Sequence, residues 1–246
     1  MNESIENLKK KFLEINRMGY VETTRSGPTG IGKTFEDLLG KDEDSCSDPD
    51  FYGIEIKTKR FYSIRDTTLF NLTPTGKEGY EIPRLVKTYG YPDRILKNKK
   101  VLIATAYGNC LNCVAAKYLM GLEVDYKNRI IRLKILNMNM DVIEDDVYWE
   151  FDAIAERLYR KLKYLAVINA SKKKVDGKDY YHYKNIIFYK LKDFSIFLKL
   201  IEMGIICIEF HIGVFRDGTK KGEIHDRGTS FRIKESNLVY LFDTIT

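Results

Sequence analysis

The order of apolar and polar residues predicts a mixture of helices and strands. In residues 5–18 the apolar side chains fall at Ile5, Leu8, Phe12 and Ile15, three or four positions apart, which predicts an amphipathic helix. Further helices are expected over residues 33–39, 151–163 and 193–203, the last with Asp193 as its N-cap. Strands are expected over residues 51–58, 164–170 and 205–215. This irregular succession predicts an α/β fold with a mixed sheet.

The remaining segments are less regular. Residues 122–140 contain two alternating runs around Lys127 and Asn128, which predicts a β-hairpin. Residues 41–50 are expected to form an acidic loop. Residues 61–115 hold three of the five prolines, so we expect loops and short strands there. A turn rich in glycine and lysine, followed by a short strand, is expected between residues 216 and 233.

Composition narrows the class of protein only moderately. With 246 residues, 44% of them hydrophobic, the chain can bury one large core or form two lobes that share a core. The net charge of +6 permits a nucleic acid or an anionic membrane surface as partner. No apolar run is long enough to span a membrane, and the N-terminus lacks the apolar region of a secretory signal.

The cysteines suggest a reducing compartment, and we expect a cytoplasmic protein. Four cysteines in a chain of this length do not resemble a disulfide framework. Cys110 and Cys113 have a spacing that metal sites use, but a structural zinc site needs about four ligands and no second close pair follows. Two ordinary side chains beside a loop are the simpler interpretation, and the role of this pair is left open.

The strongest chemical signal is a cluster of two carboxylates and a lysine. Alternate residues of a strand point to the same face, so Glu55 and Lys57 should share one face while Ile54 and Ile56 pack into the core. Asp50 lies at the turn that enters this strand and can fold back to the same place. Two carboxylates there suit Mg²⁺, and the lysine can steady a water or the charge on a phosphate.

The cluster also has a simpler interpretation, in which Glu55 and Lys57 are solvated charges on a half-exposed strand. The spacing Asp-x₄-Glu-x-Lys is common by chance. Two features favour catalysis. Pro49 directly precedes Asp50, and Glu36 on the preceding helix could reach the site or orient a ligand.

A second motif competes with this interpretation. Residues 27–34, GPTGIGKT, match the phosphate-binding loop G-x-x-x-x-G-K-[ST] at every required position. The true loop follows a buried apolar strand, and residues 19–26 do not predict one. A glycine turn at the start of a helix can also offer backbone N–H groups to a phosphate of DNA. We therefore treat Lys33 as a candidate contact to DNA.

The C-terminal segment from Arg216 to Arg232 holds five basic residues and a histidine within 17 positions. An arginine can pair with guanine through two hydrogen bonds, so this segment is a candidate for reading bases. A solvated hairpin with ordinary surface charge is the simpler alternative. The candidate DNA contacts in this segment are Lys220, Lys221, His225, Asp226, Arg227 and Arg232.

Taken together, these motifs resemble a known family. TGIGKTFEDLL, PDFYGIEIKT and KKGEIHDRGTSFRI, with TTLFNLTPTGKEG and VYWEFDAIAERLYRKLKYLAVI between them, look like the MvaI/BcnI family of monomeric type II restriction endonucleases, and most like its MvaI-type members. That family shares the PD-(D/E)xK nuclease fold with the mismatch-repair nickase MutH. The resemblance implies a mixed sheet flanked by helices, with a catalytic and a recognition lobe, over residues 1–246 as a single endonuclease chain.

The resemblance also implies an activity. It implies Mg²⁺-dependent hydrolysis of double-stranded DNA at a short, nearly palindromic site of the CCNGG kind, such as CCWGG, with strands cut one after the other. Carried over by position, Asp50 and Glu55 hold the metal, Lys57 assists and Glu36 supports, all within residues 30–60. The recognition segment lies within residues 205–235, where Arg227 replaces an expected histidine and leaves the central base pair open.

The expected biological setting follows from the same resemblance. It is a bacterial or archaeal cytoplasm, with a monomeric enzyme and a cognate DNA methyltransferase as genetic partner. Three alternatives stay open at this point. They are a MutH-like nicking enzyme of mismatch repair, a P-loop nucleotide-binding protein and a catalytically inert DNA-binding module.

Overall fold

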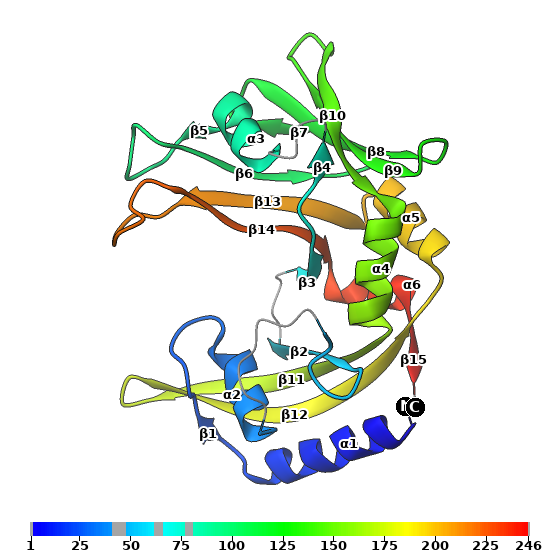
Figure 1. The fold of residues 1–246 in the computed structure, drawn as a ribbon. Coiled ribbons are helices and arrows are strands. Elements are labelled where there is room, and N and C mark those ends of the chain that lie inside the picture. The colour runs from blue at the N-terminus through cyan, green and yellow to red at the C-terminus, as the bar shows by residue number, and fades with distance from the viewer. Residues whose placement is uncertain (1, 41–47, 62–65, 77–80, 246) are drawn as a thin grey trace. The chain divides into compact units, whose positions relative to one another are not determined.

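The computed structural model describes residues 2–40, 48–61, 66–76 and 81–245. The chain folds into two compact units, each built from separate stretches of sequence (Figure 1). Unit 1 contains Met1–Arg65, Tyr159–Lys192 and Phe242–Thr246. Unit 2 contains Asp66–Leu158 and Asp193–Leu241. Within the described residues, no helix is both long and apolar enough to cross a membrane.

The elements follow one another in a mixed order. The helices are α1 (Asn2–Arg17), α2 (Gly30–Leu38), α3 (Glu81–Tyr89), α4 (Phe151–Leu162), α5 (Phe194–Glu202) and α6 (Leu238–Leu241), with a 3₁₀ turn at Glu235–Asn237. The strands are β1 (Val21–Glu22), β2 (Glu55–Arg60), β3 (Thr67–Asn71), β4 (Thr75–Gly76), β5 (Tyr91–Pro92), β6 (Lys100–Ala106), β7 (Asn112–Val114), β8 (Tyr118–Asp125), β9 (Ile130–Leu136), β10 (Val142–Glu150), β11 (Tyr164–Val175), β12 (Lys178–Leu191), β13 (Ile206–Val214), β14 (Ile224–Ile233) and β15 (Phe242–Ile245).

Unit 1 is built on a five-stranded mixed sheet. Its strands run in the order β1-β12-β11-β2, and β15 pairs with β12 off this path. β2 runs parallel to β11, with Glu55 opposite Leu165 and Lys57 opposite Val167, whereas the other pairs are antiparallel. The predicted mixed sheet is therefore confirmed. Among the described strands, β2 is at the edge of the sheet, with β11 as its one neighbour.

The core of unit 1 forms between α1, α2 and one face of this sheet. The apolar stripe of α1 is buried, as predicted from its spacing. Ala166, Ile168 and Ala170 alternate along β11 and belong to the same apolar cluster as Ile54 and Ile56. The alternate face of β2 is thereby left to Glu55 and Lys57, as the sequence predicted.

Unit 2 contains two five-stranded sheets, β4-β10-β9-β8-β7 and β3-β14-β13-β6-β5. Aromatic side chains from distant parts of the sequence meet in its core. Phe231 stacks on Phe70 with ring centroids 4.8 Å apart and meets Trp149 edge to face at 5.9 Å. The indole N–H of Trp149 donates to the carbonyl of Leu72 at 2.9 Å, so its one polar atom is satisfied inside the unit.

Several predicted elements are confirmed. The hairpin around Lys127 and Asn128 is formed by β8 and β9. Asp193 caps α5 by accepting a hydrogen bond from the backbone N–H of Ser195. Residues 41–47, most of the predicted acidic loop, lie outside the described residues.

Other predictions need correction. α2 begins at Gly30, three residues before the predicted start, so the end of the predicted glycine turn is helical. β2 begins at Glu55, because residues 51–54 form a tight turn and not a strand. Helix α3 occupies part of the segment expected to be loops and strands. Pro83, one of the three prolines of that segment, lies in the first turn of α3, where the missing N–H costs no helical bond.

Candidate active site

The turn before β2 brings Asp50 back to the start of the strand. Phe51 and Ile54 exchange two backbone hydrogen bonds of 2.9 Å, which closes a two-residue turn. The central residues, Tyr52 and Gly53, have φ of 44° and 86°, as this kind of turn requires. A carboxylate oxygen of Asp50 then accepts a hydrogen bond from the backbone N–H of Ile56 at 2.9 Å.

Glu55 lies buried between two lysines. Its side chain is only 1% exposed, while those of Lys57 and Lys161 are 27% and 24% exposed. The ammonium group of Lys57 donates to Oε1 of Glu55, and that of Lys161, near the end of α4, lies 3.4 Å from the same oxygen. Lys161 was not among the predicted site residues. The basic end of its helix was visible in the sequence, but the sequence did not show which cation meets β2.

Burial controls the charge of Glu55. Removal of this carboxyl from water raises its pKa above the ordinary value, and the nearby charge of Asp50 acts in the same direction. Lys57 and Lys161 favour the ionised form but do not outweigh the burial. Oε2 of Glu55 is buried and has no hydrogen-bond partner among the described residues. Such an oxygen is rare in a folded protein, and it suggests a ligand that binds here.

The protein supplies only some of the ligands that a hard divalent cation needs. No group of three or more His, Cys, Asp and Glu that could hold a metal occurs in the part of the chain that the structure describes. Mg²⁺ is commonly held by one or two carboxylates, with water and substrate phosphates as its other ligands. The open Oε2 of Glu55 and the neighbouring Asp50 match that smaller set.

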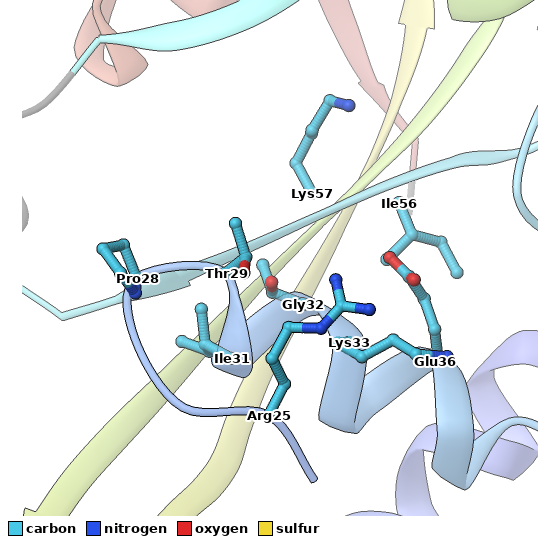
Figure 2. Close-up of a pocket in the computed structure, with 10 residues that line it drawn as sticks. Arg25, Pro28, Thr29, Ile31, Gly32, Lys33, Glu36, Ile56 and Lys57 are labelled. Carbon is cyan, nitrogen blue, oxygen red and sulfur yellow. The ribbon is translucent and has the colours of Figure 1, made fainter. Parts of the chain in front are cut away.

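Glu36 lies on α2 and lines a hollow beside the edge strand β2. This hollow of about 310 Å³ is lined by Glu36 and Lys33 of α2 and by Ile56 and Lys57 of β2. In Figure 2, Lys57 extends from β2 away from α2, whereas Glu36 extends from α2 toward Ile56. The structure thus brings Asp50, Glu55 and Lys57 together and places Glu36 in the hollow that Lys57 also lines.

The segment that matches a phosphate-binding loop has its key side chains occupied. Thr34 is 1% exposed, and its hydroxyl accepts a hydrogen bond from the backbone N–H of Thr24 at 3.0 Å. The ammonium group of Lys33 lies 2.5 Å from a carboxylate oxygen of Asp37, one helical turn further on. The strand that precedes the loop, β1, is only two residues long and lies at the edge of the sheet, whereas a true phosphate-binding loop follows a buried strand. These contacts do not favour a nucleotide site.

The glycines of that segment have structural reasons to be there. A side chain at Gly30 would overlap the carbonyl oxygen of Arg25, and one at Gly32 would lie 3.3 Å from the hydroxyl of Thr58. Close packing of α2 against its own loop and against β2 therefore accounts for two of the three glycines.

The predicted recognition segment lies in the β13–β14 hairpin of unit 2. The ring of His225 stacks on Phe215, with centroids 4.0 Å apart and planes 5° from parallel. Lys220 places its ammonium group 5.8 Å from the same ring. Asp226 accepts a hydrogen bond from the backbone N–H of Gly228. Arg227 is exposed on β14, and Lys221 is exposed in the turn before it.

Arg232 is held within unit 2. Its guanidinium donates to the carboxylate of Glu209 and to the carbonyl of Asp66, the latter at 2.7 Å, and its side chain is 22% exposed. Two of its N–H groups are therefore used inside the protein. This arrangement was not visible in the sequence, because Glu209 lies on β13 and Asp66 is 166 residues away.

Solved restriction endonuclease structures share this fold. The structure titled "Restriction endonuclease MvaI-cognate DNA substrate complex" superposes with a TM-score of 0.91 at 35% sequence identity, covering 100% of this chain and 98% of that chain. The structure titled "Restriction endonuclease MvaI in the absence of DNA" has the same identity and coverage, with a TM-score of 0.65. A comparison with curated proteins gives no significant match.

These likenesses define the class of protein as a type II restriction endonuclease, that is, a site-specific deoxyribonuclease. The sequence matches the MvaI/BcnI restriction endonuclease family over residues 9–242, and the chain belongs to that family. The resemblance drawn from the motifs is confirmed, and the predicted α/β restriction-endonuclease fold is confirmed with it. The family match decides against the mismatch-repair and P-loop alternatives.

Proposed function

We propose that this enzyme cuts both strands of duplex DNA at a short, nearly palindromic site of the CCNGG kind, such as CCWGG. We assign catalysis to Asp50, Glu55 and Lys57, with Glu36 in support. The observation that carries this assignment is the buried carboxylate of Glu55, which lies between two lysines and beside Asp50. One of its oxygens has no hydrogen-bond partner among the residues that the structure describes.

The residues have separate tasks in this proposal. Asp50 and Glu55 would hold Mg²⁺, which when bound polarises the phosphate and makes a water more acidic. Lys57 stabilises negative charge that develops on the phosphate, and its contact with Glu55 keeps its ammonium group oriented. We assign to Glu36, which lines the same hollow as Lys57, the task of orienting the water or a ligand of the site.

DNA binding is assigned to both units. MvaI has been solved with its cognate DNA, which supports duplex DNA as the partner here. We assign phosphate contacts to Lys33, Lys220 and Lys221. We assign base contacts to His225, Asp226, Arg227 and Arg232. For Arg232 to read guanine, its hydrogen bonds to Glu209 and Asp66 must be exchanged for bonds to the base.

We further propose that the enzyme acts as a monomer in a bacterial or archaeal cytoplasm, with a cognate DNA methyltransferase as its genetic partner. One catalytic centre meets two antiparallel strands, so it must cut them in sequence. Nicked plasmid circles should then appear before linear product at low enzyme concentration. Linear product without a nicked precursor, together with a dimer in sedimentation, would contradict this.

The active-site assignment is tested by plasmid cleavage in Mg²⁺ and in EDTA. Asp50→Asn, Glu55→Gln and Lys57→Ala should lose cleavage, and Asp243→Asn, an exposed carboxylate on β15, is the matched control. Because burial raises the pKa of Glu55, the neutral glutamine should fit better than the charged carboxylate. Glu55→Gln should therefore melt a few degrees higher than wild type in EDTA. Full cleavage by Asp50→Asn or Glu55→Gln would overturn the assignment.

A further inference from the structure

Three neighbouring hollows in unit 1 have lining residues in common, and we call the three together the track. The hollow beside Lys57 shares Pro28 and Ile31 with a second hollow of about 240 Å³, which reaches Arg60 and Lys172. The second shares Gly27 with a third hollow of about 370 Å³, lined by Lys174 of β11 among others. The track therefore runs from the candidate catalytic lysine, past the loop before α2, to the hairpin formed by β11 and β12.

Cations outnumber carboxylates in the lining of the track. Its acidic lining residues are Glu22, Glu36 and Asp179. Its basic lining residues are Arg25, Lys33, Lys57, Arg60, Lys172, Lys174 and Lys178. Some of these charges are paired, since Lys33, Lys57, Lys172 and Lys178 meet Asp37, Glu55, Asp179 and Glu22. Counted over the three hollows together with these partners, cations remain in excess, which suits an anionic polymer better than a single small anion.

The cations of the two strands and the open backbone of the loop suit a phosphate-bearing strand. Arg60 on β2 lies opposite Ala170 of β11, so it points to the same face of the sheet as Lys172 and Lys174, whereas Lys57 points to the other face of the edge strand. Gly27, with φ of 89°, has no atom within 4 Å of where a side chain would begin, so a phosphate can approach the backbone there.

The hairpin provides an internal comparison. Lys172 and Lys174 point to the face of β11 that lines the track. Lys173 points to the other face, where its ammonium group lies 4.5 Å from the ring centroid of Tyr20 and 5.7 Å from that of Tyr180. Neighbouring lysines of one strand therefore differ in whether they face the track.

We infer that the track binds the backbone of the DNA strand flanking the cut, through Arg60 and Lys174 together with the loop at Gly27. This inference rests on the proposed function, because it takes Lys57 as the position of the phosphate that is cut. It assigns these residues to affinity and not to the chemical step. It also gives the glycine-rich motif a role in DNA binding in place of nucleotide binding. Figure 2 shows the end of the track nearest the catalytic residues, where Arg25 reaches from the loop over α2.

The test is the salt dependence of DNA binding. Affinity for a random-sequence duplex is measured by fluorescence anisotropy in Ca²⁺, so that the DNA is not cut, for wild type, Arg60→Ala, Lys174→Ala and the control Lys173→Ala. Each lost phosphate contact should lower the slope of log affinity against log salt by about 0.9. When the salt is raised from 50 to 200 mM, the affinity of wild type should fall by a factor about 3.5 times larger than the factor for Arg60→Ala or Lys174→Ala. Lys173→Ala should follow wild type.

Two outcomes would overturn the inference. One is an unchanged slope in both Arg60→Ala and Lys174→Ala, with melting temperatures equal to wild type. The other is an equal loss in Lys173→Ala, which would place the DNA on the opposite face of the hairpin. A failure of the proposed function is recognised separately, because the wild-type protein would then not cleave plasmid in Mg²⁺.

Discussion

Replacing Lys161 by methionine should make DNA cleavage more sensitive to acid. Methionine keeps much of the length and apolar character of the side chain but removes the charge that lies 3.4 Å from Oε1 of Glu55. Lys161 holds the pKa of Glu55 down against the effect of burial. Without it, Glu55 keeps its proton to a higher pH. Since the ionised carboxylate is the active form in our proposal, the acidic limb of the pH–rate profile should move to higher pH.

The size of the effect follows from the distance. Two unit charges 3.4 Å apart attract by about 1.2 kcal/mol at the dielectric constant of water and by about 5 kcal/mol at an effective value of 20. Lys161 is 24% exposed and Lys57 remains beside Glu55, so we take the lower figure. An energy of about 1.2 kcal/mol changes the protonation equilibrium constant of Glu55 by about eightfold. On the acidic limb, Lys161→Met should therefore cut about eightfold more slowly than wild type and approach it as the pH rises.

The assay is the initial rate of plasmid nicking at saturating Mg²⁺, across the pH range in which the wild-type rate rises. Lys163→Met is the matched control, since it removes an exposed lysine two residues away and leaves Glu55 untouched. Melting curves at each pH exclude unfolding as the cause. Coincident acidic limbs for Lys161→Met and wild type would refute the electrostatic role of Lys161, and an equal shift in Lys163→Met would show a non-specific effect of charge.

Two predictions concern stability, both measured by urea unfolding. Gly30→Ala should lower the free energy of unfolding by about 1–3 kcal/mol, because the new methyl group meets the carbonyl oxygen of Arg25. Gly213→Ala, where the nearest atom is 3.9 Å away, should cost much less; equal losses would show that the close approach is not the cause. Glu144→Gln should cost about 1.5–3 kcal/mol at neutral pH, because it removes the charge that pairs with Arg84. Burial acts to raise the pKa of Glu144, but Arg84 and the N–H of Asp146 outweigh it and lower the pKa. This stabilisation is therefore present above the ordinary carboxyl range and lost as the pH falls. If the difference in free energy of unfolding between wild type and Glu144→Gln stayed the same in acid, the prediction would be wrong.

The sequence by itself determined the local arrangement at the catalytic strand. The alternation of Ile54 and Ile56 with Glu55 and Lys57 sets which face carries charge, because a strand has a period of two and the apolar face is drawn into the core. The stripe of α1 and the cap at Asp193 follow from equally local rules. The family was also visible in the sequence, because several motifs occur in the same order and spacing.

Only the tertiary structure decided which distant groups meet. It placed Lys161 beside Glu55, Glu209 and Asp66 against Arg232, and Thr24 against Thr34. No periodicity or spacing predicts such pairs, because they depend on how separate elements pack and not on the order of neighbouring residues. The pKa of Glu55 has the same origin, since desolvation arises only when the folded chain buries the carboxylate.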